Sequence, residues 1–219
     1  GIVPRRHRAR HRQLTMPRAR AARAIAAVIG RKATLDEALL RTLGTLAGRD
    51  RALARELAYG VCRHFFELDA LLAQLLARPL KSRDDDVRAL LLVGLYQLRH
   101  MRVPDHAAVS ETVAATGQLG KPWARGLANA VLRAAQARAG ELAAALDRAQ
   151  RAAHPAWLVQ ALERAWPAQL EDILAANNAA PPMSLRVNVA RTTRDAWLAL
   201  ARAAGIEARP CLLSEHGVV

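Results

Sequence analysis

The chain has 219 residues, of which 52% are apolar and 24% charged, so it is long and apolar enough to bury a core. Its net charge is +14, from 33 Lys and Arg against 19 Asp and Glu. The composition excludes collagen, disulfide-scaffold and low-complexity classes. Two cysteines make neither a disulfide framework nor a zinc site and fit the cytoplasm. No apolar stretch reaches the about 20 residues of a membrane-spanning helix, so no membrane partner is expected.

The positive charge is concentrated at the N-terminus. Residues 1–35 contain ten Lys or Arg and no acidic residue. Thirty of the 33 cations are Arg, which pairs bidentately with phosphate and stacks on bases. We therefore expect the N-terminus to bind a polyanion. Residues 1–17 show almost no apolar pattern and are predicted to be a disordered basic arm, in which Met16 is a candidate start of the native chain.

The first predicted helix runs from about Arg18 to Gly30. Arg20, Arg23 and Arg31 fall within an arc of about 80° on a helical wheel. Ile25, Val28 and Ile29 occupy the neighbouring arc. One face of this helix is thus predicted to pack while the other meets phosphate.

Local signals delimit the next two helices. Thr34 and Glu37 have the spacing of a capping box, so a second helix begins there and is expected to end at Gly48. Asp50 is the expected cap of the third helix, whose apolar residues recur every four positions.

A later helix is apolar on nearly every side. Asp84, Asp85 and Asp86 stand in its first turn, where carboxylates favour the helix dipole, and the apolar residues of 87–98 follow. A helix of this kind is normally the buried centre of a bundle. Two further helices are predicted from Pro104 to about Gly120 and around 123–138, and a short one over 140–150.

The pattern changes after residue 150. Two short helices are predicted before Pro181, and then residues 183–188 alternate as a strand does. Thr192 or Thr193 caps a helix that ends at Gly205, and residues 206–212 are the second expected strand. Two strands and one helix cannot cover both faces of a sheet, so we expect the missing part to follow Val219.

Few residues suggest catalysis. No G-x-G, G-x-S-x-G or H-E-x-x-H occurs, and the seven His are scattered in sequence without metal-like spacing. His100 and His106 are interpreted as structural or surface residues. Cys62 is expected to be a small core residue and Cys211 not to be a nucleophile. By themselves these residues describe a binding module.

Several motifs, taken in order, resemble a known family. The segments Ala58–Arg63, Val93–Leu98, His106–Val113 and Gly126–Arg133 are similar to the NusB helical fold over about residues 18–138. His154-Pro155, Asn177-Asn178, Pro181-Pro182 and Leu185-Arg186-Val187-Asn188 resemble the segment that joins such a domain to a methyltransferase domain in the RsmB (Sun) ribosomal RNA cytosine-C5 methyltransferases.

The resemblance implies a mainly α fold. It consists of a NusB-like helical RNA-binding domain over 18–150, followed over 151–219 by linker helices and an incomplete α/β segment. The full-length enzymes use S-adenosylmethionine and two cysteines in a catalytic half whose motifs are absent here. We therefore expect this fragment to bind no cofactor, to hold no metal and to be inactive. Its expected partners are small-subunit ribosomal RNA and its own C-terminal methyltransferase domain.

The candidate RNA-binding residues combine the basic positions with the resemblance. They are Arg18, Arg20, Arg23, Arg31 and Lys32 near the N-terminus; Arg51, Arg55 and Arg63 in the third helix; and Arg186 and Asn188 in the strand motif. Asn129 matches the family's Asn in the last long helix, where we expect it to cap or to bond a loop backbone.

Two other functions remain open from the sequence alone. One is a stand-alone NusB-type RNA-binding factor in transcription antitermination, which is expected to end soon after residues 138–150. The other is a helical interaction domain with no RNA role.

Overall fold

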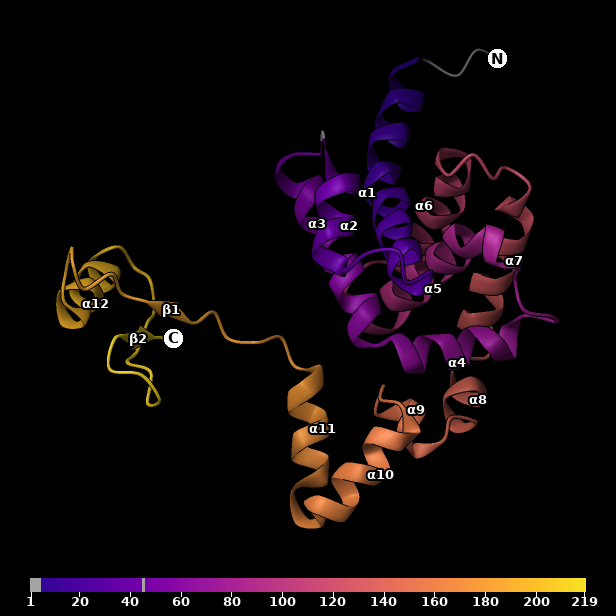
Figure 1. The fold of residues 1–219 in the computed structure, drawn as a ribbon. Helices are drawn as coiled ribbons and strands as arrows, with labels where there is room; N and C mark the ends of the chain where they lie inside the picture. Colours follow the sequence, from indigo (N-terminus) through magenta and orange to yellow (C-terminus); the bar gives the residue numbers. More distant parts are fainter. Residues whose placement is uncertain (1–4, 45) are drawn as a thin grey trace. The chain divides into compact units, whose positions relative to one another are not determined.

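The computed structural model describes residues 5–44 and 46–219, with side chains described from Pro17 onward. The chain divides into two compact units, one through Asn178 and one from Ala179 to Val219. The first unit is helical throughout and the second holds one helix and a two-stranded sheet (Figure 1). The predicted mainly α fold, a helical bundle followed by a small α/β segment, is confirmed.

Seven helices build the bundle. They are α1 (Arg5–Ile29), α2 (Leu35–Leu43), α3 (Gly48–Arg63), α4 (Phe65–Leu75), α5 (Asp85–His100), α6 (Asp105–Gln118) and α7 (Ala124–Ala137), with the 3-10 turn η1 (Ser82–Asp84) before α5. Helix α1 packs against α2, α3, α5 and α6, and α5 packs against α1, α3, α4, α6 and α7. These two helices therefore form the centre, and the others surround them.

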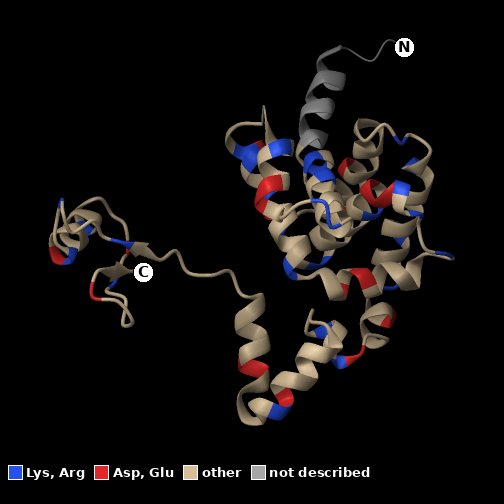
Figure 2. Ribbon diagram, in the orientation of Figure 1, with Lys and Arg blue, Asp and Glu red and all other residues tan. Residues whose placement is uncertain are grey.

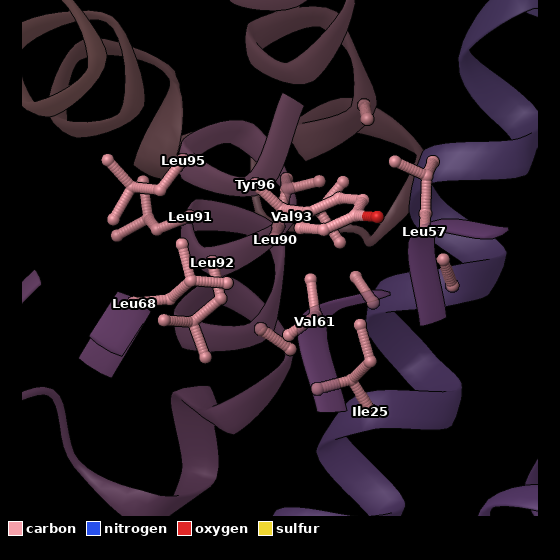
Figure 3. Close-up of a cluster of buried hydrophobic side chains, with 14 of the residues drawn as sticks. Ile25, Leu57, Val61, Leu68, Leu90, Leu91, Leu92, Val93, Leu95 and Tyr96 are labelled. Carbon is pink, nitrogen blue, oxygen red and sulfur yellow. The ribbon is translucent and has the colours of Figure 1, made fainter. Parts of the chain in front are cut away.

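The core gathers around α5, as its all-round apolar sequence predicts. Every residue of α5 from Ala89 to Gln97 is buried. Figure 3 shows Ile25 of α1, Leu57 of α3 and Leu68 of α4 directed toward the side chains of α5. Burying a Leu or Ile side chain stabilises a fold by about 1.5–3 kcal/mol, so this cluster is the main stabilising feature of the bundle.

A glycine lets α3 approach α5 closely. A Cβ added to Gly60 would lie 2.0 Å from Cζ of Tyr96, a distance that no side chain tolerates. The Tyr96 ring is buried, and its hydroxyl donates to Oε1 of Glu56 at 2.8 Å. The ring therefore has no simple way to move aside.

The helix boundaries confirm some predictions and correct others. The capping box is confirmed, because Thr34 and Glu37 exchange hydrogen bonds. The second helix, however, ends at Leu43, and Gly48 begins the third helix instead of ending the second. Asp50 lies inside the first turn of α3 and does not cap it, since the N-cap is Ala47.

Two predictions near the N-terminus and after α7 also need correction. Helix α1 begins at Arg5, so residues 5–17 are helical where a disordered arm was predicted. The predicted helix over 140–150 is two short helices, α8 (Ala139–Ala144) and α9 (Arg148–Arg151), with Asp147 capping the second.

The first unit ends in an arm of short helices. Helix α9 is followed by α10 (Ala156–Ala165), the 3-10 turn η2 (Pro167–Gln169) and α11 (Leu170–Asn178). Val159, Leu170 and Leu174 form a small core of their own.

Two of the family-like motifs meet in this arm. The ring of His154 is buried, and its Nδ1 bonds the carbonyl of Ala152. Nδ2 of Asn178 donates to the same carbonyl at 2.7 Å, and Nδ2 of Asn177 lies 3.3 Å from Nε2 of His154. The His-Pro and Asn-Asn pairs, more than 20 residues apart, are therefore one polar cluster that joins α9 to α11.

The second unit contains β1 (Leu185–Arg186), α12 (Arg194–Ala203) and β2 (Gly217–Val218). The strands pair antiparallel, with Arg186 opposite Gly217. The first strand lies inside the predicted range 183–188. Thr193, one of the two residues predicted as the cap of the following helix, caps α12. The second strand was predicted wrongly at 206–212. That segment is no strand, but Pro210 forms an isolated bridge to Val218, and the backbones of Arg209 and Cys211 bond those of Val219 and Gly217.

Candidate RNA interface

Helix α1 exposes a narrow basic stripe. Its alanines over residues 19–24 and Ile25 are buried because four helices pack against it, and small side chains permit this. Arg20 is half-buried and Arg23 is exposed. Nη2 of Arg23 donates to the carbonyl of Gln118, at the end of α6, over 2.7 Å. The stripe is therefore narrower than the predicted face, and the end of α6 positions the Arg23 guanidinium.

The turn after α1 presents two more cations. The N–H of Lys32 donates to the carbonyl of Ala27, and the N–H of Arg31 donates to that of Val28, both over 2.9 Å. This is a Schellman cap, in which the left-handed position is usually a glycine. Here it is Arg31, with φ +54°. Both Arg31 and Lys32 are exposed, and the cap fixes where they leave the backbone.

Arg18 does not belong to this surface, which corrects its prediction as an RNA contact. Its side chain is 6% exposed, and its Nε donates to Oε1 of Gln97 at 2.9 Å. Burial lowers the pKa of Arg18, and the nearby Glu111 carboxylate partly offsets this. A guanidinium that is held inside the bundle by Gln97 cannot reach a phosphate outside it.

Helix α3 carries the next group of predicted residues. Arg51 and Arg55 are exposed and one turn apart, whereas Arg63 is half-buried near the end of the helix. The guanidinium of Arg55 lies over the ring of Tyr59, 5.6 Å from its centroid. The Tyr59 hydroxyl donates to Asp36, and this bond raises the pKa of Tyr59.

The cations of α1 and α3 lie on adjoining elements, since the two helices pack against each other. Figure 2 shows Lys and Arg on both. Both helices thus carry cations, and the described residues of α1 include no Asp or Glu, whereas α3 contains Asp50 and Glu56. We call the set of Arg20, Arg23, Arg31, Lys32, Arg51 and Arg55 the α1–α3 surface.

The second unit holds the remaining predicted residues in a hollow of about 440 Å³. Arg186 and Asn188 line it together with Arg191 and Trp197, which sequence reasoning missed. Oδ1 of Asn188 accepts the N–H of Ala190 at 3.1 Å, so this side chain also shapes the turn before α12. An arginine pair beside an indole ring suits a phosphate and a stacked base.

One titratable cluster escaped the sequence analysis because His100 lies 33 residues after Glu67. Oε2 of Glu67 lies 2.8 Å from Nε2 of His100 and 3.7 Å from Nδ1 of His64. The two imidazole rings are stacked at 4.0 Å, and Oε1 of Glu67 accepts Nη2 of Arg99 at 2.7 Å. The pKa of Glu67 is lowered because the bonds from His100 and Arg99 outweigh its burial.

The same three groups place one potential metal-ligating atom each within 4.8 Å of one another. A metal would have to displace the Arg99 guanidinium and the His100 imidazole from the Glu67 carboxylate, and the positive charge of Arg99 opposes a cation there. The geometry therefore favours an ion-pair cluster that fastens α4 to the end of α5.

The described residues offer little for methyl-transfer chemistry. Burial raises the pKa of the Cys62 thiol to about 11, so it stays protonated at neutral pH. Each described strand has two residues, and the sequence has no G-x-G to form a nucleotide loop after one. The residues present thus do not fit an S-adenosylmethionine site, and no catalytic step is derived from them.

Comparison with known proteins defines the class. Residues 15–137 match the NusB family, and residues 154–219 match the Methyltr_RsmF/B-like, ferredoxin-like domain. The first match covers more than half of the chain, so the chain belongs to the NusB family. The two domains occur here in the order of the N-terminal region of the RsmB family, which confirms the resemblance drawn from the motifs.

Three curated relatives share one name, Ribosomal RNA small subunit methyltransferase B. The chain is 53% identical over 205 residues to Ribosomal RNA small subunit methyltransferase B of Pseudomonas putida KT2440. The aligned residues make up 93% of this chain and 47% of the relative. The protein of that name from Pseudomonas syringae pv. tomato DC3000 is 51% identical, over 93% and 46%. The one from Escherichia coli O1:K1 is 41% identical, over 88% and 45%. The chain therefore spans about half the length of the curated relatives it matches. Among the described residues, no helix has the length and apolarity needed to cross a membrane.

Proposed function

We propose that this chain is the RNA-binding region of an S-adenosylmethionine-dependent small-subunit ribosomal RNA cytosine-C5 methyltransferase. In this role it binds ribosomal RNA and presents it to a catalytic domain in the cytoplasm. The observation that carries the proposal is the ferredoxin-like domain at residues 154–219, which follows the bundle and matches methyltransferases. The exposed cations of the α1–α3 surface supply the RNA contacts.

The alternative is a stand-alone NusB-type antitermination factor. The match of residues 15–137 to the NusB family favours it as far as the bundle is concerned. It does not account for the arm of short helices, in which His154, Asn177 and Asn178 join α9 to α11, nor for the second unit. We therefore rank it second.

Complementation separates the two functions. The chain is fused to the remaining region of the Pseudomonas putida relative and expressed in a strain that lacks the methyltransferase. Bisulfite sequencing of the small-subunit ribosomal RNA then reads C5 methylation of cytosine. The proposal expects methylation to return with the fusion and not with the chain alone. A fusion that is folded and binds S-adenosylmethionine but restores no methylation contradicts it.

A further inference from the structure

A polar groove of about 590 Å³ lies between α6 and α7, and its described lining includes none of the residues predicted to bind RNA. Arg125, Asn129 and Arg133 of α7 line one wall, and His106 and Ser110 of α6 line the other. All five side chains belong to exposed residues. The groove therefore combines accessible cations with hydrogen-bonding groups on two facing helices.

The α7 wall is a regular ladder. Arg125, Asn129 and Arg133 are four residues apart, so they repeat on one side of the helix and the two arginines are separated by about 12 Å along its axis. That separation lets each contact a different phosphate of one strand. Nε of Arg133 donates to Oδ1 of Asn129 at 3.1 Å, which orients the guanidinium. Asn129 thus binds a side chain rather than capping or bonding a loop, as was predicted for it.

The floor of the groove is apolar. Val109 and Val113 of α6 lie there, 5% and 8% exposed, with Ala114 beside them. Asp105 is the single acidic residue among the described lining residues. Because the two valines are almost fully buried, a ligand in the groove meets mainly the guanidinium, imidazole, amide and hydroxyl groups of its walls. Bases stack on histidine rings and phosphates pair with arginines, so these walls suit a single strand of RNA. An acidic protein segment would satisfy the arginines but would bring no base to stack on the imidazole.

We propose that this α6–α7 groove binds a single-stranded segment of RNA. Its bases stack on the exposed His106 ring, and its phosphates pair with Arg125 and Arg133. The inference rests on the proposed function, because it adds a second RNA contact to the same chain. The family motif around Asn129 then has a reason beyond packing, since Asn129 holds Arg133 in place for the strand.

The test uses the whole chain and a small-subunit ribosomal RNA fragment that contains 4-thiouridine. The double variant Arg125→Ala with Arg133→Ala is compared with the control Arg138→Ala with Arg151→Ala, which removes the same charge from exposed positions outside the groove. Each phosphate contact contributes about a factor of five to affinity at 0.1 M salt. The groove variant should thus bind about 25-fold more weakly, and the control within about two-fold. Cross-linked peptides of the wild type should include peptides from residues 105–136 beside those from the α1–α3 surface.

The outcomes separate this inference from the proposed function. A variant of the α1–α3 surface that loses affinity, beside a groove variant that binds and cross-links like the wild type, overturns the groove and leaves the function. The groove proposal is also overturned if an acidic peptide that carries a photoreactive group cross-links to the groove while the 4-thiouridine RNA does not. If the wild-type chain shows no salt-dependent RNA binding, both the groove proposal and the proposed function are contradicted.

Discussion

Replacing Arg18 with Met tests whether this arginine is structural, as its burial indicates. Its Nε bond to Gln97 is one link in a chain, because Nε2 of Gln97 donates onward to Oγ1 of Thr112 at 3.1 Å. Gln97 and Thr112 are both 0% exposed. Loss of a hydrogen bond from a charged donor, with a buried carbonyl left unsatisfied, costs about 2–4 kcal/mol. For a unit of this size, a loss of about 3 kcal/mol lowers Tm by about 6–12 °C.

Urea and thermal melts followed by circular dichroism measure this loss, and Arg20→Met is the matched control. Arg20 is half-buried on the exposed stripe of the same helix, so its replacement should cost less than about 0.5 kcal/mol. RNA binding, measured at a temperature where both variants are folded, should reverse this order, so that Arg20→Met has the larger effect. Arg20→Met should flatten the slope of log K against log salt by about 0.7, and Arg18→Met should leave it unchanged. A stable Arg18→Met with a flattened slope would refute the structural role.

Three further outcomes follow from the packing and the caps. Gly60→Ala forces a methyl group onto the Tyr96 ring and should destabilise the bundle by about 2 kcal/mol or more. Gly126→Ala, whose added Cβ meets nothing within 4 Å, should instead stabilise α7 by about 0.5–1 kcal/mol. Denaturant melts in which both variants change the free energy of unfolding in the same direction would contradict the packing. Glu67→Gln should cost about 1–2 kcal/mol at neutral pH, since its partners are partly exposed. Because the pKa of Glu67 is lower in the folded protein than its ordinary value of 4.5, the stabilisation is fully present above pH 4.5 and is lost as the pH falls through the pKa of the folded state. Plots of the free energy of unfolding against pH for the variant and the wild type should therefore converge in acid and not in base. Arg31→Gly relieves a left-handed arginine, so Tm should hold or rise slightly while RNA affinity falls; a lowered Tm would show that the cap depends on the arginine.

The helical plan could be predicted from sequence because its signals are local. The capping box at Thr34 and the all-round apolar segment of α5 each identify a structural role within a few residues. The second strand could not be predicted in this way. Residues 206–212 have an apolar character, but backbone pairing with β1 selects Gly217 and Val218, and that choice depends on a tertiary contact.

The candidate site was predicted less completely for the same reason. A helical wheel places Arg18 and Arg20 on α1 but does not show which neighbours pack there, and α5 and α6 bury the first. The His64, Glu67 and His100 cluster and the groove lined by Arg125 and Arg133 form only when separate helices meet. Spacing along one helix shows the repeat of Arg125 and Arg133 on α7 but not the facing wall of α6, and it does not bring His100 to Glu67.

The salt dependence of binding to small-subunit ribosomal RNA tests the central claim most directly. The wild-type chain is compared with the triple variant Arg20→Ala, Arg23→Ala and Arg31→Ala, after melts have shown that both are folded. Each phosphate neutralised on single-stranded RNA contributes about −0.7 to the slope of log K against log salt, so the triple variant should flatten the slope by about 2. An unchanged slope would contradict the assignment of these arginines, and a slope near zero in the wild type would contradict RNA binding by this chain.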